Sequence, residues 1–179
     1  MSPLTVPVNE DDHIKGSLRA PVLLVEYGDF ECPHCRRAHP IVQKLIQLLG
    51  DQLGFVFRNF PLAEIHPHAE QAAEAAEAAA AIGGAESYWE MHDTLFANQS
   101  ALELEDLVSY AEEIGLDTNE FVEAMESGEY AKHVQKDFMS GVRSGVNGTP
   151  TFFINGERYD GDWANVKAFA AALAQAVVV

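Results

Sequence analysis

The two cysteines of the chain, Cys32 and Cys35, stand where a strand pattern gives way to a helix pattern. The apolar, β-prone run 22–27 precedes them, and residues 41–49, with apolar side chains at helical spacing, follow them and end at a glycine. Pro33 suits the first position of a helix, because proline has no N–H to lose there and its φ is already helical. The sequence therefore predicts a buried strand that leads into a helix, with Cys32 as the N-cap.

This placement gives the two cysteines different surroundings. Cys32 would face free backbone N–H groups and the positive end of the helix dipole, which stabilise a thiolate and lower a cysteine pKa from ~8.5 to about 3.5–7.5. Cys35 lies one turn further on and can close a disulfide with Cys32. We therefore expect a redox pair in which Cys32 is the nucleophile and Cys35 resolves the mixed disulfide.

Charged neighbours of Cys32 should tune its pKa. His34 stabilises the thiolate if it is cationic or donates a hydrogen bond; the alternative is a solvent-exposed histidine without effect. Asp29 and Glu31 would raise the pKa of Cys32 by repulsion, but only weakly if they are exposed and screened.

Glu26 interrupts an apolar strand six residues before Cys32. A buried carboxylate is costly without a partner or a role, and burial raises its pKa. Glu26 is therefore a candidate proton acceptor for Cys35 during exchange. The alternative is a carboxylate at the strand end that reaches water or an arginine.

Thr149-Pro150 stands directly before the apolar run 151–154. Proline cannot donate to a strand ladder, so a proline at a strand start marks an edge strand or a cis bond. A cis Thr149–Pro150 bond would expose the backbone of Thr149 for pairing with an extended substrate segment. An ordinary trans turn is the other interpretation.

A metal site is the alternative to redox chemistry for the cysteine pair. His66 and His68 could complete a two-cysteine, two-histidine zinc site, but their spacing is not that of a zinc finger and no second cysteine pair exists. We expect no metal and no organic cofactor. The remaining histidines are interpreted as surface or packing residues: His13, His39, His92 and His133.

Charge and composition restrict the partners. The net charge of −17 disfavours nucleic acid and anionic membranes as partners. No apolar run reaches the ~18 residues of a membrane span, and we expect a monomer. Residues 1–12 have neither the basic region nor the apolar core of a secretory signal, so the chain as it stands is expected in the cytoplasm, or outside it if a signal was removed.

The order of patterns predicts an α/β fold in one domain, residues 1–179. Strands at 22–27 and 55–60 with a helix between them form a parallel βαβ unit, and Asn155-Gly156 marks a hairpin near the C-terminus. Residues 64–144 are read as an all-helical insertion. We also expect an edge strand near 4–8, helix caps at Ser100 and Asp117, and a last helix from Trp163 to about Ala176.

Residues 30–35 and 148–152, Phe-Glu-Cys-Pro-His-Cys and Gly-Thr-Pro-Thr-Phe, together resemble the DsbA-like thiol:disulfide oxidoreductases of the thioredoxin superfamily. The resemblance extends over about residues 20–176. It implies a thioredoxin-like fold of the type βαβ…ββα with a mixed sheet and an inserted helical subdomain. It also implies an exposed attacking Cys32, a buried Cys35, a cis-proline element at Thr149-Pro150 and a buried acid at Glu26.

The Pro33-His34 dipeptide is similar to that of the oxidising members, so the resemblance implies an enzyme that donates disulfides to protein or peptide substrates and is recycled by a redox partner. Oxidising members usually work outside the cytoplasm, which leaves a disulfide isomerase or a cytoplasmic reductase on the same scaffold as the alternative. A chaperone-like or metal-binding module is the alternative from a different class.

Overall fold

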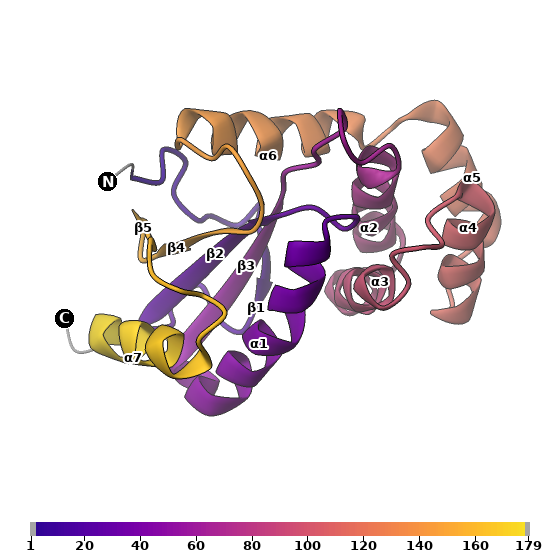
Figure 1. Ribbon diagram of the computed structural model, residues 1–179. Helices are drawn as coiled ribbons and strands as arrows, with labels where there is room; N and C mark the ends of the chain where they lie inside the picture. Colours follow the sequence, from indigo (N-terminus) through magenta and orange to yellow (C-terminus); the bar gives the residue numbers. More distant parts are fainter. Residues whose placement is uncertain (1–2, 178–179) are drawn as a thin grey trace.

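The computed structural model describes residues 3–177, and its centre is one mixed five-stranded sheet (Figure 1). The strand order is β1-β3-β2-β4-β5; β2 and β3 are parallel and the other pairs are antiparallel. The strands are β1 (His13–Lys15), β2 (Val22–Gly28), β3 (Leu53–Asn59), β4 (Thr151–Ile154) and β5 (Glu157–Arg158). The predicted parallel βαβ unit and its hairpin partner are confirmed.

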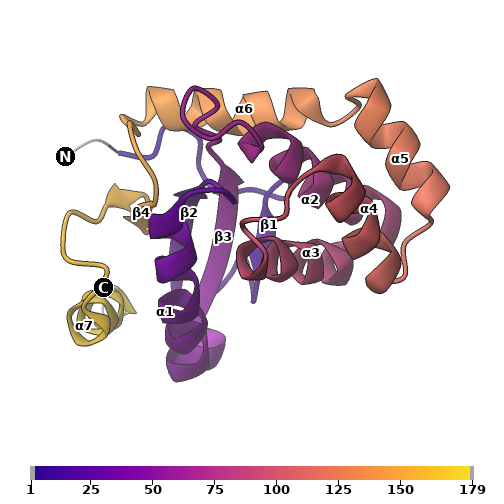
Figure 2. The ribbon, with the colours of Figure 1, turned by 45° about the vertical axis from the view of Figure 1, so that its right-hand side comes forward.

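Helices surround this sheet. They are α1 (Pro33–Leu49), α2 (Ala69–Gly83), α3 (Ala85–Ala97), α4 (Leu104–Glu113), α5 (Thr118–Ser127), α6 (Ala131–Arg143) and α7 (Val166–Val177), with a 3-10 turn η1 (Gly50–Gln52). Figures 1 and 2 show α2 to α5 gathered at one side of the sheet and α7 at the other, with α1 between them. The helices α2 to α6 fall between β3 and β4, and the boundaries 64–144 of a separate insertion stay a prediction.

The two faces of the sheet bury different side chains because successive residues of a strand point to opposite faces. Val25 and Tyr27 of β2 pack with Val56 of β3 in one apolar cluster, to which Phe138 of α6 adds. Leu24 packs in the other cluster, together with residues of α1, α2 and α7. By this alternation Glu26 shares the face of Leu24, so its carboxylate points toward the layer that contains α1.

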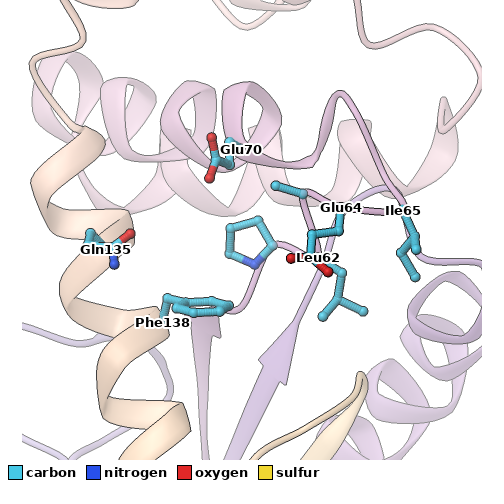
Figure 3. A pocket seen from close by; sticks show the side chains of 8 residues that line it. Leu62, Glu64, Ile65, Glu70, Gln135 and Phe138 are labelled. Atoms are coloured by element: carbon cyan, nitrogen blue, oxygen red, sulfur yellow. The ribbon is translucent and has the colours of Figure 1, made fainter.

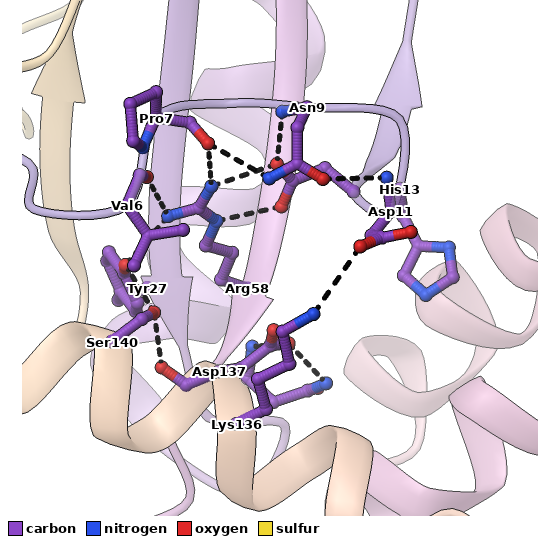
Figure 4. Close-up of polar contacts among 12 residues, drawn as sticks. Val6, Pro7, Asn9, Asp11, His13, Tyr27, Arg58, Lys136, Asp137 and Ser140 are labelled. Carbon is purple, nitrogen blue, oxygen red and sulfur yellow. Dashed lines mark hydrogen bonds and ion pairs between the residues drawn. The ribbon is translucent and has the colours of Figure 1, made fainter.

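The edge strand expected near residues 4–8 lies at β1 instead. The carbonyl groups of Val6 and Pro7 accept hydrogen bonds from the Arg58 guanidinium at 2.8 and 3.2 Å (Figure 4). Arg58 is buried and also pairs with Asp12 at 2.8 Å. Because this side chain satisfies the carbonyls of Val6 and Pro7, they need no strand partner. Only the start of the segment pairs with the sheet, where Leu4 N–H donates to the Gly156 carbonyl at 2.8 Å.

Two helix starts also differ from the prediction. The N-cap of α4 is Glu103, whose side chain forms a capping box with Asp106, and not Ser100. The last helix begins at Val166 and not at Trp163, because the Asn165 side chain accepts from the backbone N–H of residue 168 and caps it there. The observed cap of α4 and the observed first residue of α7 each lie three residues beyond the expected position. The cap expected at Asp117 is confirmed.

Candidate active site

Cys32 and Cys35 lie at the junction of β2 and α1. Cys32 is the N-cap of α1, with extended φ and ψ of −72° and 123°, and Pro33 is the first helical residue. The Cys32 backbone N–H donates to the carbonyl of Asp29 at 3.1 Å, which closes the loop between strand and helix. Cys32 is 3% exposed and Cys35 is fully buried, so the cysteine at the helix start is the one nearer to solvent.

The surroundings separate the acidities of the two thiols. The pKa of Cys32 is lowered to about 5, first by a hydrogen bond from the Cys35 thiol and then by Thr149 and the backbone N–H groups of Cys35 and His34, against the effect of burial. Burial and the hydrogen bond to Cys32 raise the pKa of Cys35 well above 9. At neutral pH the reduced pair therefore holds one thiolate, at Cys32, and one thiol, at Cys35.

The acidity of Cys32 predicts the pH dependence of its alkylation. In the reduced protein, the rate of reaction of Cys32 with iodoacetamide should rise with pH along a single titration with its midpoint at about 5. The rate follows the ionisation of Cys32 because only the thiolate is nucleophilic. Mass spectrometry of peptides after timed quenching measures the rate at each cysteine separately. A midpoint above 8 for Cys32 would contradict the stabilisation described here.

Glu26 is buried beneath this pair. It is 2% exposed, and its Oε1 has no hydrogen-bond partner among the described residues. Burial, and then the Cys32 thiolate, raise the pKa of Glu26 to about 8. The Glu26 charge in turn contributes to the raised pKa of Cys35. A carboxyl group that titrates near neutrality thus lies within electrostatic reach of both sulfur atoms.

The imidazole of His34 is exposed and points along the helix surface. Its Nδ1 accepts a hydrogen bond from Arg37 Nη2 at 2.8 Å. The contribution of His34 to the thiolate of Cys32 comes from its backbone N–H. Besides the Cys35 thiol, the main-chain groups of the helix start thus stabilise the thiolate, as expected, and an effect of the His34 side chain stays a prediction.

Thr149 and Pro150 are brought next to Cys32 from the other end of the chain. The Cys32 Sγ lies 3.6 Å from the carbonyl oxygen of Thr149, and the Thr149–Pro150 bond is cis. Residues 117 positions apart therefore form one site.

The acidic residues before Cys32 are paired with histidines. Asp29 is buried and accepts from the backbone N–H of Leu62 at 2.9 Å, and its Oδ2 lies 2.8 Å from His66 Nδ1. Glu31 lies 3.1 Å from His68 Nδ1 and accepts from its backbone N–H at 2.7 Å. Each histidine contacts a carboxylate in place of the cysteine sulfur that a zinc knuckle requires. Each of the two carboxylates thus has a histidine and a backbone N–H as hydrogen-bond partners.

Gln99 is a residue of this site that the sequence analysis missed. Its side-chain amide donates to the carbonyls of Phe30 and Cys32 at 2.8 and 2.9 Å and so ties the loop after α3 to the start of α1. Gln99 falls in a connection without periodicity or motif, so no pattern distinguishes it from other polar loop residues. The contact exists only because α3 packs beside α1.

A pocket of about 380 Å³ lies beside the segment that follows β3 (Figure 3). Side chains of that segment, α2 and α6 line it: Pro61, Leu62, Ala63, Glu64, Ile65, Glu70, Gln135 and Phe138. Ile65 is largely exposed. Because Leu62 is hydrogen-bonded to Asp29, this partly apolar surface is connected to the loop that carries the cysteines.

Comparison with known proteins gives the family. Residues 8–174 match the family model described as Thioredoxin. The Na⁺/H⁺ antiporter NhaA 1 of Salinispora arenicola (strain CNS-205) is 45% identical over 174 residues, which are 97% of this chain and 26% of that protein. The chain thus spans about a quarter of the length of the curated relatives it matches. No helix within residues 3–177 has both the length and the apolar character needed to cross a bilayer.

Solved structures give the fold. BdbD from Bacillus subtilis has a TM-score of 0.86 at 21% identity and covers 99% of both chains. Alpha-DsbA1 from Wolbachia pipientis has a TM-score of 0.80 at 20% identity, over 98% of this chain and 94% of that one. The expected α/β thioredoxin-like fold is therefore confirmed. The chain belongs to the thioredoxin family and has the fold of its DsbA-type thiol-disulfide oxidoreductases.

Proposed function

We propose that the chain is a thiol:disulfide oxidoreductase that donates disulfides to protein or peptide substrates. The observation that carries this proposal is the lowered pKa of Cys32, at about 5, beside a Cys35 thiol of raised pKa. A stabilised thiolate favours the reduced pair, and a disulfide whose reduced form is favoured is a strong oxidant.

The proposed reaction begins with the oxidised pair. A substrate thiolate attacks Cys32 Sγ, a mixed disulfide forms, and the bond to Cys35 breaks. The Cys35 thiolate takes a proton, for which Glu26 in its acid form is the proposed donor. A second substrate thiolate then attacks the mixed disulfide and releases Cys32 as a stable thiolate. Two electrons pass from two substrate thiols to the pair, and a separate redox partner must remove them.

Thr149 and Pro150 are the proposed substrate contacts. The Thr149 carbonyl lies next to Cys32 Sγ, where the backbone of an extended substrate would pass. The pocket lined by Leu62 and Ile65 offers apolar surface for neighbouring substrate side chains. The antiporter name belongs to proteins about four times as long as the matched segment, and transport is not proposed for this chain.

The redox potential tests the direction of transfer. At pH 7 a cysteine pKa of about 5, in place of 9, favours the reduced pair by about 100-fold, which corresponds to about 60 mV. Applied to the ≈ −270 mV of a reductase, this shift gives about −210 mV, so we expect equilibration with glutathione buffers to give a potential of about −210 mV or less negative. A value at the reducing end would instead identify a reductase and reject the disulfide donor. The potential is measured by quantifying the alkylated and disulfide forms by mass spectrometry in each buffer.

A further inference from the structure

A second cluster of titratable side chains lies where β1, α2 and α6 meet. His13 Nε2 of β1 is 2.6 Å from Glu77 Oε2 and 2.7 Å from Glu77 Oε1 of α2. His133 Nε2 of α6 is 2.8 Å from the same Oε1. One carboxylate thus lies between two imidazole nitrogens that come from elements far apart in the sequence. Both histidines were expected to be surface or packing residues, and the structure adds a shared carboxylate partner to each of them.

The cluster is enclosed. The Glu77 side chain is 3% exposed, and the His13 ring stacks on buried Tyr88 with 3.7 Å between the ring centroids. His133 is about one-third exposed and lines a small pocket of about 50 Å³ together with Asp137 (Figure 4 shows the neighbouring residues). The donors are therefore held by packing and still have a path to solvent.

Further polar atoms surround the three donors. Asp137 Oδ2 lies 3.8 Å from His133 Nε2 and accepts from the backbone and side-chain N–H groups of Asn59 at 3.0 and 2.9 Å. The Asn59 Nδ2 is 3.5 Å from Glu77 Oε1, while Asn59 Oδ1 is buried without a hydrogen-bond partner among residues 3–177. The site thus has a second carboxylate and an unsatisfied amide oxygen at its border.

Two imidazole nitrogens and a carboxylate are the donor set of many zinc sites. We propose that His13, Glu77 and His133 bind one divalent transition-metal ion of the Zn²⁺ class. Ligand atoms around a tetrahedral zinc ion are roughly 3.3 Å apart, given bonds of about 2.0–2.1 Å. The distances of 2.6–2.8 Å between the histidine nitrogens and the Glu77 oxygens are shorter than this by about 0.5–0.7 Å, as expected where protons bridge these atoms. The ion would replace those protons after a small outward movement of the partly exposed His133.

The consequence of the proposal is a link between sheet and helices. The ligands of the ion would come from β1, α2 and α6. Asp137 and Asn59 would not bind the ion but would orient its ligands. None of these residues belongs to the Cys32–Cys35 site, so metal binding here is independent of the proposed disulfide exchange. The ion should act as a structural clamp, and it should raise the midpoint of thermal unfolding.

Zinc titration of the oxidised chain, residues 1–179, tests the proposal, since the disulfide removes the Cys32 and Cys35 thiolates as competing ligands. Competition with a chromophoric chelator should show one Zn²⁺ per chain. Glu77→Gln and His133→Gln should each weaken zinc binding by about 100-fold or more. Replacing a residue that only hydrogen-bonds to a ligand typically lowers metal affinity by 10–100-fold. Co²⁺ should give the visible absorption of a four-coordinate ion and lose it in both variants.

The matched control is His68→Gln. His68 is as exposed as His133, at 32%, and also lies between two carboxylates, but no second histidine joins it. Its replacement should leave zinc affinity unchanged. A competing cluster is formed by His39, His92 and Asp93, and loss of binding in His39→Gln with retention in Glu77→Gln would place the ion there and overturn the proposal.

Absence of saturable binding below about 100 μM free Zn²⁺ in the parent chain would equally overturn the proposal, as would unchanged affinity in both cluster variants. If Glu77→Gln does not fold, the surface-accessible His133→Gln decides the outcome alone, with circular dichroism to confirm its fold.

Discussion

Replacing Cys32 by serine should reduce disulfide transfer to the uncatalysed rate, a loss of at least about 10³-fold, because a hydroxyl is not ionised at neutral pH and forms no disulfide. Cys32 is the only cysteine placed at the helix start, and its thiolate is the one that the site stabilises. Oxidation of a reduced peptide with two cysteines, followed by mass spectrometry, measures the rate. Undiminished transfer by Cys32→Ser would exclude the proposed mechanism.

Cys35→Ser is the matched variant for this experiment. Cys32 remains reactive, but the residue that would resolve the intermediate is gone. The variant should accumulate a mixed disulfide between Cys32 and a substrate, visible as a reductant-sensitive adduct of the expected mass. The two variants together distinguish the attacking cysteine from the resolving one, since equal trapping by both would assign no separate roles.

Glu26→Gln should slow the step in which Cys35 attacks the mixed disulfide, by about 10²-fold at pH 7. The pKa of Cys35 lies well above 9, so its thiol needs a proton acceptor, and Glu26 is buried within reach. In the mixed disulfide Cys32 carries no charge. The repulsion that contributes to the raised pKa of Glu26 is then removed, and its carboxylate becomes more populated. Rapid acid quenching of the glutathione adduct at Cys32 measures this step.

The pH profile separates proton transfer from a merely structural role. In the parent chain the rate should rise as Glu26 ionises, with a midpoint at or below its pKa of about 8, and level off above that pH. In Glu26→Gln the rate should continue to rise with pH as solvent base deprotonates Cys35. Glu26→Asp should restore part of the plateau. A plateau at the same pH in Glu26→Gln would assign the base to another group.

Glu26 should also affect the stability of the reduced protein. Its pKa rises from 4.5 to about 8 on folding, so the folded state binds a proton that the unfolded state has released between these values. Glu26 alone therefore makes stability fall as pH rises from about 4.5 to 8, whereas Cys32, whose pKa is lowered from 9 to about 5, makes it rise between those values. Removing the Glu26 contribution in Glu26→Gln should leave stability rising more steeply with pH than in the parent chain. Urea unfolding at several pH values shows the difference.

Local patterns in the sequence were sufficient to predict the strand–helix junction at Cys32, the parallel pair β2 and β3, and the hairpin at Asn155-Gly156. Each rests on neighbours in the chain: apolar periodicity, a proline at the first helical position and the turn preference of Asn-Gly. The lowered pKa of Cys32 could be expected for the same reason, because the N–H groups of a helix start belong to the adjacent residues.

The contacts between distant segments were decided by tertiary packing alone. Gln99 reaches the Cys32 carbonyl because α3 packs beside α1, and Asp29 meets His66 because the segment after β3 folds back over the active-site loop. The hydrogen-bonded cluster of His13, Glu77 and His133 joins three elements. The reactivity of the cysteine pair depends mainly on four consecutive residues, 32–35, and can therefore be predicted from the sequence. The contacts of Glu77 with two histidines depend on side-chain directions that only the packing of helices and sheet determines.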